Sequence, residues 1–124
     1  MKIVISATGR DLESNIDAIF GRALFFLIMD TKTKKVKVIE NKARDRPTGV
    51  GITAVNTVEK EGIEAVITAA IGPLAFETFE HSGVKIYKAE GKIKDAIRLF
   101  EGGKLSEITK ATRAKYAGLK RKRK

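Results

Sequence analysis

Three short, almost entirely apolar runs constrain this chain most, because runs of this kind predict strands buried on both faces of a sheet. They cover residues 3–5, 24–29 and 65–71. Two further segments, residues 35–38 and 84–87, alternate between apolar and polar side chains. Alternation with outward lysines suits the edge strands of a sheet. We therefore predict five strands, with the two alternating ones at the edges.

Apolar side chains recur at helical spacing in three segments that lie between or after these strands. The first runs from Thr48 to Gly62, the second from Gly72 to Gly83 and the third from Ile93 to Gly102. A glycine at the end of each segment is typical of a helix C-terminus, and the proline after Gly72 suits a first helical position. We expect residues 105–109 to add one more turn that packs on the body of the protein.

The order of these segments predicts an α/β fold with three layers, α/β/α. A short polar connection, residues 30–34, predicts an antiparallel hairpin of the second and third strands. Strands separated by a helix are predicted to be parallel, through right-handed crossovers. We therefore predict a five-stranded mixed sheet of order 3-2-1-4-5, with strand 2 antiparallel, in one domain that spans residues 1–109.

Most of the excess basic charge lies at the C-terminal end. The formal net charge is +10, and residues 110–124 hold eight basic side chains and no acidic one. Subtracting these 8 from 25 leaves 17 basic against 15 acidic residues elsewhere, a net charge of +2. Because like charges repel, we predict a disordered tail over residues 110–124. Two interpretations stay open: a tail that binds nucleic acid or another polyanion, and a solubilising tail without a partner.

The chain contains no cysteine, which excludes disulfides, thiolate metal ligands and cysteine nucleophiles. No apolar run approaches the length of a membrane span, and the N-terminal residues lead into a predicted strand rather than a signal segment. We therefore expect a soluble, cytoplasmic protein that does not bind a membrane. The absence of glutamine and the abundance of Lys, Glu and Arg are typical of thermophile proteins.

The carboxyl ends of the first, third and fourth predicted strands lie at one edge of the predicted sheet. Loops from this edge lead into helix N-termini at residues 48–51 and 72–73, where glycine lets the backbone approach a ligand. Helix N-termini suit anions, because their N–H groups are unpaired and carry partial positive charge. We infer either an arginine-rimmed cavity for an anionic ligand, or glycines that serve turns beside solvated arginines. The basic residues of these loops are Arg10, Arg22, Lys42, Arg44 and Arg46.

Several motifs occur in a fixed order along the chain. Residues 20–23 read Phe-Gly-Arg-Ala, residues 49–52 read Gly-Val-Gly-Ile, and residues 71–76 read Ile-Gly-Pro-Leu-Ala-Phe, followed by Ser-Gly-Val-Lys-Ile-Tyr at residues 82–87. This combination, over about residues 1–101, resembles the dinitrogenase iron–molybdenum cofactor-binding family, which includes NifX-type domains and the C-terminal domain of NifB-type proteins. The resemblance implies a ribonuclease H-like fold with a five-stranded mixed sheet. It also implies binding or transfer of an iron–molybdenum cluster or its precursor, together with proteins that donate or accept the cofactor.

The resemblance and the loop residues together define a set of candidate cofactor-binding residues. From the resemblance, the glycines at positions 49, 51 and 72 would supply backbone donors and Arg22 an electrostatic contact. The full set is Gly9, Arg10, Phe20, Gly21, Arg22, Thr48, Gly49, Gly51, Gly72 and Pro73.

The sequence does not predict side-chain ligation of a cluster, which generally needs cysteine or histidine. The chain has no cysteine, and its one histidine, His81, is predicted near the C-terminus of its helix, away from the proposed cavity. Met29 lies inside an apolar strand and is expected in the core. Recognition of an assembled anionic cluster through amides and arginines remains, as does a different ligand.

The residues argue against an enzyme. Nucleases of ribonuclease H-like fold hold two metal ions with carboxylates on central strands, where this chain has Ile3, Val4, Ile5 and Thr68. We predict a small non-catalytic protein that binds or carries an anionic metallocluster, either the iron–molybdenum cofactor or a precursor, or a related anion. The alternative is association with nucleic acid or another polyanion through the basic tail. Deletion of residues 110–124 is expected to separate the two functions.

Overall fold

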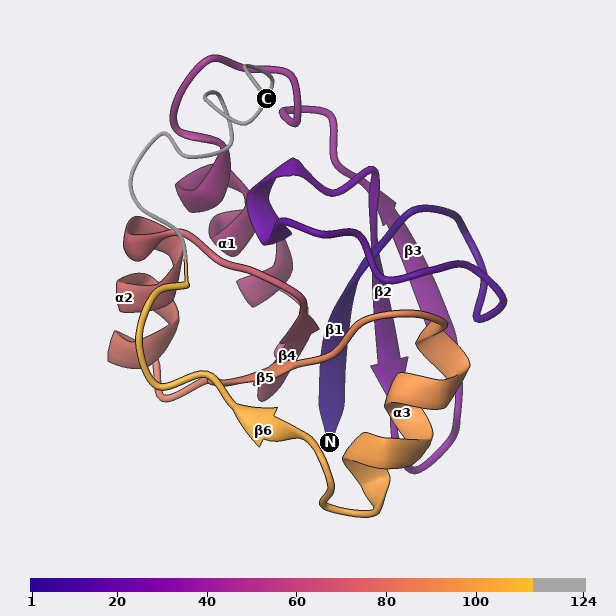
Figure 1. Ribbon diagram of the computed structural model, residues 1–124. Helices are drawn as coiled ribbons and strands as arrows, with labels where there is room; N and C mark the ends of the chain where they lie inside the picture. The colour runs from indigo at the N-terminus through magenta and orange to yellow at the C-terminus, as the bar shows by residue number, and fades with distance from the viewer. Residues whose placement is uncertain (113–124) are drawn as a thin grey trace.

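The computed structural model describes residues 1–112, which form one six-stranded mixed sheet with helices on both faces (Figure 1). A single 3-10 turn, η1 (Phe20–Arg22), precedes the second strand. The strands are β1 (Lys2–Ala7), β2 (Phe25–Asp30), β3 (Val36–Glu40), β4 (Ala65–Thr68), β5 (Lys85–Lys88) and β6 (Ser106–Glu107), and the helices are α1 (Val50–Glu59), α2 (Pro73–His81) and α3 (Ile93–Glu101).

The strand order is β3-β2-β1-β4-β5-β6. β2 runs antiparallel to β1 and β3, whereas β1, β4 and β5 run parallel to one another. The predicted α/β class, the order of the first five strands and the direction of the second are confirmed. The predicted number of strands was wrong, because β6 adds a sixth strand, antiparallel to β5.

β6 occupies the segment for which one more turn was expected. Gly103, with a φ of 70°, lies just after α3, and the chain then runs back along the open side of β5. Tyr87 pairs with Glu107 and Lys88 with Ser106, and the N–H of Ile108 donates to the carbonyl oxygen of Ile86 at 2.7 Å. The unpaired backbone groups of β5 therefore determine the conformation of this segment, and a two-residue strand has too little periodicity to reveal it.

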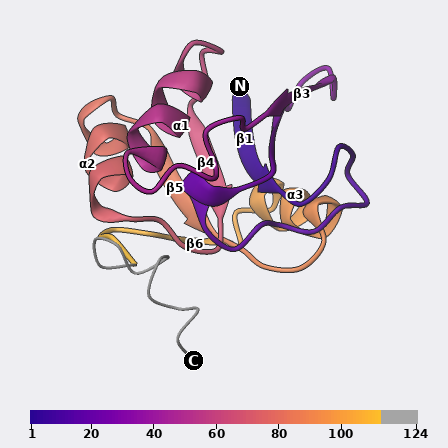
Figure 2. The ribbon, with the colours of Figure 1, turned by 90° about the horizontal axis from the view of Figure 1, so that it is seen from above.

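The three layers explain why the first strand reads as a continuous apolar run. α1 and α2 cover one face of the sheet and α3 covers the other (Figures 1 and 2). Val4 packs in the core on the side of α1 and α2, whereas Ile3 and Ile5 pack in the core on the side of α3. All three side chains are fully buried. A central strand covered on both faces needs apolar residues at every position, and this was the basis of the strand prediction.

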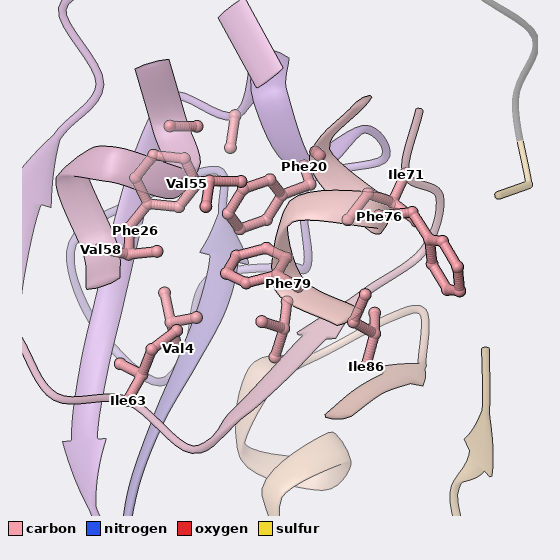
Figure 3. Packing of buried hydrophobic residues seen from close by; sticks show 14 of the residues in the cluster. Val4, Phe20, Phe26, Val55, Val58, Ile63, Ile71, Phe76, Phe79 and Ile86 are labelled. Carbon is pink, nitrogen blue, oxygen red and sulfur yellow. The ribbon is translucent and has the colours of Figure 1, made fainter. Parts of the chain in front are cut away.

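The core under α1 and α2 is built around aromatic rings (Figure 3). The ring centroid of Phe20 lies 5.0 Å from that of Phe26 and 5.2 Å from that of Phe79, the latter in edge-to-face geometry. Phe20 comes from η1, Phe26 from β2 and Phe79 from α2. The rings thus fix η1 against the sheet and against a helix at once.

The basic tail was predicted over residues 110–124, and seven of its eight basic residues lie in 113–124, outside the described residues. Its disorder, its partners and the limits of the domain stay predictions. Along residues 1–112, no helix has both the length and the apolar character that would let it cross a membrane.

Candidate functional site

The candidate site is the edge of the sheet where the strands β1, β3 and β4 end, as predicted from the topology. The connections after β1 and β4 meet there: Ile19 forms a bridge with Ala70, and the N–H of Phe20 donates to the carbonyl oxygen of Ala70 at 2.9 Å. η1 is therefore tied to the loop that leads into α2. α1 begins beside η1 at the same end of the molecule (Figure 1).

Two glycines let η1, α1 and α2 approach one another closely. A Cβ atom placed on Gly21 would lie 2.9 Å from the Cα atom of Gly51, and one placed on Gly51 would lie 3.3 Å from the Cβ atom of Ala75. Gly21 is buried and Gly51 is half-buried. Both were predicted to line the site, and their immediate role in the structure is to allow the backbone packing that holds two helix N-termini side by side.

These N-termini are the part of the site that suits an anion. Gly49, with a φ of 77°, is the N-cap of α1, and Gly72 is the N-cap of α2. Neither helix has a side-chain hydrogen bond at its N-cap, and a Cβ atom on either glycine would meet nothing within 4 Å. Open space thus lies beside both caps, at the positive end of each helix dipole. Thr48 is exposed beside the first cap, and Pro73 is the first residue of α2.

Arg22 holds a loop together. Its guanidinium donates to the carbonyl oxygens of Arg44 at 2.9 Å, of Arg46 at 2.6 Å and of Pro47 at 3.2 Å. The Nε of Arg44 donates in turn to the carbonyl oxygen of Arg22 at 3.3 Å. The predicted electrostatic contact of Arg22 with a ligand therefore competes with three contacts that fix the loop before α1. A guanidinium suits this task because its donors form a rigid planar fork.

The side chain of Arg46 contacts α1 itself. Its guanidinium donates to Oγ1 of Thr53, in the first turn of α1, at 3.3 Å. Arg46 is exposed, whereas Arg44 is half-buried and also pairs with Asp45 at 3.3 Å. Arg46 is therefore the arginine whose contacts bring its charge to the beginning of α1.

Gly9 and Arg10 lie elsewhere. They belong to a loop that packs on α3, where Ile93 donates its N–H to the carbonyl oxygen of Ser14 at 3.0 Å. The guanidinium of Arg10 lies 4.6 Å from the ring centroid of Phe25, whose side chain packs on the α3 side of the sheet. The structure thus places Gly9 and Arg10 over the other face from α1 and α2. Phe20, also a candidate, has no exposed surface and belongs to the core.

Three buried polar side chains that were not predicted organise this edge. The Nδ2 of Asn41 donates to the carbonyl oxygens of Gly21 at 3.1 Å and Ala23 at 2.9 Å, so it fixes η1. Ser6 and Thr68 share a hydrogen bond of 2.8 Å between their hydroxyl oxygens, where β1 and β4 end. The available signal was one hydroxyl residue after the first apolar run, Ser6, and one inside the third, Thr68, because a buried hydroxyl requires a partner.

The donor set does not fit side-chain ligation of a metal cluster. The chain has no cysteine, and among residues 1–112 no three His, Asp or Glu side chains gather around a metal-sized position. His81 is exposed and is the last residue of α2, about 12 Å along the helix from its first residue. The prediction that His81 lies away from the candidate site is confirmed.

Comparison with known proteins decides the family. Residues 1–103 match the family model described as dinitrogenase iron–molybdenum cofactor. The chain belongs to this family. An uncharacterised protein of Methanocaldococcus jannaschii is 37% identical to this family member over 93 residues, which are 72% of this chain and 79% of the relative.

Solved structures support the same assignment. The apo form of the orange protein from Desulfovibrio gigas superimposes with a TM-score of 0.86 and 26% identity, over 90% of this family member and 96% of that chain. A proposed NifB protein from Thermotoga gives a TM-score of 0.80 and 37% identity, over 90% and 97% of the two chains. A proposed dinitrogenase from M. jannaschii gives 0.67 and 29%, over 89% and 96%.

Proposed function

We propose that this protein is a small, non-catalytic carrier of an anionic metallocluster, either the iron–molybdenum cofactor or a precursor, or of a related anion. One observation carries the proposal: the N-termini of α1 and α2 lie side by side, without side-chain caps, and open space lies beside Gly49 and Gly72. Membership of the iron–molybdenum cofactor family supports a cluster as the cargo.

The cargo is recognised as an assembled anion. First-turn amides of both helices donate hydrogen bonds to its oxygen or sulfur atoms, and the two helix dipoles add to the attraction. Arg46, beside the first turn of α1, supplies an exposed positive charge next to them. Because no cysteine holds the cluster, the interaction is reversible and suits a protein that receives a cargo and passes it to another protein.

The middle of β1 and the end of β4 carry no carboxylate. Val4 and Ile5 occupy the middle of β1, and Thr68 ends β4 with its hydroxyl bound to Ser6. A nuclease that uses two metal ions requires carboxylates at such positions. We therefore propose that proteins which donate or accept the cargo, rather than a chemical substrate, are the functional partners.

An amide NMR titration under anaerobic conditions tests the proposal, first with the isolated cofactor and then with tetrathiomolybdate. We expect shifts concentrated at residues 49–52 and 72–75. A parallel titration with duplex DNA tests the alternative, in which the basic residues 110–124 bind a polyanion. Shifts with DNA alone, together with none at the two helix N-termini in either cluster titration, would contradict the carrier proposal.

A matched pair of substitutions sharpens the test. Gly72→Asp places a carboxylate where it can accept the first-turn N–H groups of α2, as a natural N-cap does, so the fold should be kept or slightly stabilised. The same carboxylate occupies the site and repels the anionic cargo, so binding of the cargo should be lost. Gly72→Asn caps the helix without charge and should bind more tightly than Gly72→Asp. Equal binding by wild type and Gly72→Asp would exclude the N-terminus of α2 from the site.

A further inference from the structure

The segment after α3 stays packed on the domain. Residues 104–112, which we call the strap, pass through β6 and then along α2 toward its N-terminus (Figure 1). At the end of the strap, Thr112 forms hydrogen bonds with both backbone polar groups of Ile71. The N–H of Ile71 donates to Oγ1 of Thr112 at 2.8 Å, and the N–H of Thr112 donates to the carbonyl oxygen of Ile71 at 3.1 Å.

The strap is anchored along its length, so these contacts are part of a packed segment. Ile108 is buried in the core under α1 and α2 and donates its N–H to Ile86 at 2.7 Å. Ala111 packs against the same core. The pairing of β6 with β5 and the buried side chain of Ile108 therefore bring Thr112 to Ile71.

Ile71 is the residue before Gly72, the N-cap of α2, and it is itself fully buried. The preceding residue, Ala70, accepts the N–H of Phe20. The four-residue loop before α2 is thus held by η1 from one side and by the strap from the other. A shift of either attachment moves the first turn of α2 relative to that of α1.

We propose that the strap completes the anion site and that Thr112 is its positioning residue, holding the N-terminus of α2 where it meets the cargo. This inference rests on the proposed function for the identity of the cargo. Thr112 does not touch the cargo. It acts through the backbone of Ile71 and of Gly72.

This placement changes the design of a tail deletion. Removal of residues 110–124 deletes the contact of Thr112 together with all eight basic residues of the tail. This deletion therefore does not separate binding at the N-termini of α1 and α2 from binding of a polyanion by the tail. Truncation after Thr112 removes seven basic residues and keeps the contact, whereas truncation after Lys110 removes the contact as well. The two truncations differ only by Ala111 and Thr112.

The test compares Thr112→Val, which removes the hydroxyl at nearly constant shape, with Thr112→Ser, which keeps it. Amide exchange at residues 71–75 is measured in the protein without cargo, and tetrathiomolybdate affinity is measured at high salt, where charges on exposed residues are screened. We expect faster exchange and affinity weakened about two- to tenfold in Thr112→Val, the range that one lost hydrogen bond produces. Thr112→Ser should behave as wild type.

Thr109→Val is the matched control, because Thr109 is an exposed strap residue for which the described residues provide no side-chain hydrogen bond. At high salt, truncation after Lys110 should bind more weakly than truncation after Thr112. Unchanged exchange at residues 71–75 in Thr112→Val, or equal binding by the two truncations, overturns the inference. Faster exchange in a protein whose wild type binds no tetrathiomolybdate supports the positioning role and rejects only the proposed function.

Discussion

The backbones of Gly21 and Gly51 touch so closely that a Cβ atom on Gly21 would lie 2.9 Å from the Cα atom of Gly51. Gly21 belongs to η1, before the second strand, and Gly51 to the first turn of α1, thirty positions further along the chain. This contact sets the distance between η1 and one of the two helix N-termini of the site.

Gly21→Ala should therefore destabilise the protein, because the new methyl group meets backbone that has no side chain to rotate away. We expect a loss of about 1–3 kcal/mol in the free energy of unfolding, measured by urea denaturation. Gly102→Ala is the matched control, since a Cβ atom there makes only ordinary contacts of 3.5 Å and longer, and its φ is −83°. It should change stability by less than about 0.5 kcal/mol. Equal stability of the two variants would contradict the packing role of Gly21.

Arg22→Lys tests whether Arg22 orders a loop or contacts a ligand. One ammonium group cannot reach the carbonyl oxygens of Arg44, Arg46 and Pro47 with the geometry of a guanidinium, so the loop should loosen. We expect a loss of about 1–2 kcal/mol in the free energy of unfolding and amide shifts concentrated at residues 41–49. Wild-type stability combined with lost tetrathiomolybdate binding would instead assign Arg22 to the ligand.

Phe20→Ala should cost about 3–5 kcal/mol, because it removes a fully buried ring that packs on two other rings. Thermal or urea unfolding measures the loss. Phe20→Leu fills much of the cavity and should keep the fold and the ligand affinity. If Phe20→Leu were as stable as wild type yet failed to bind, Phe20 would line the site rather than support it.

One carboxylate in the hairpin between β2 and β3 should make the stability of the fold depend on acid pH. The backbone N–H groups of Lys32 and Thr33 donate to the Asp30 carboxylate and hold its pKa below the usual value of 3.8. Because the folded-state pKa is the lower one, this stabilisation is present above the unfolded-state pKa and is lost as the pH falls through the folded-state value. Asp30→Asn should therefore lose less stability than wild type between about pH 4 and pH 2. Parallel stability–pH curves for the two proteins would show that the hairpin does not contribute.

The strands were predictable where burial imposed a continuous pattern. β1 and β4 are covered on both faces, so apolar residues fill them, and this determined their places at the centre of the sheet. β6 was not predictable in the same way, because two exposed residues carry no period. Its conformation depends on the free side of β5, which only the folded sheet provides.

The candidate site was predictable only in part. The sequence showed that glycines stand at the beginning of the helices after residues 48 and 71. It did not show why each glycine is needed. Gly21 lies against the backbone of Gly51 and Gly51 lies against the Cβ atom of Ala75, whereas a Cβ atom on Gly49 or Gly72 would meet nothing within 4 Å. The role of Arg22 was hidden for a similar reason: its partners are backbone carbonyl groups more than twenty residues away, which leave no side-chain signature.

The short sixth strand also affects how the protein behaves when it is concentrated. By covering β5, β6 leaves β3 as the long open edge of the sheet within residues 1–112. That edge displays Lys37, whose ammonium group binds the Glu61 carboxylate at 3.0 Å and 3.1 Å. A second molecule that added a strand there would have to place its own backbone beside a charged side chain. The protein is thereby protected against the edge-to-edge growth that begins amyloid-like aggregation.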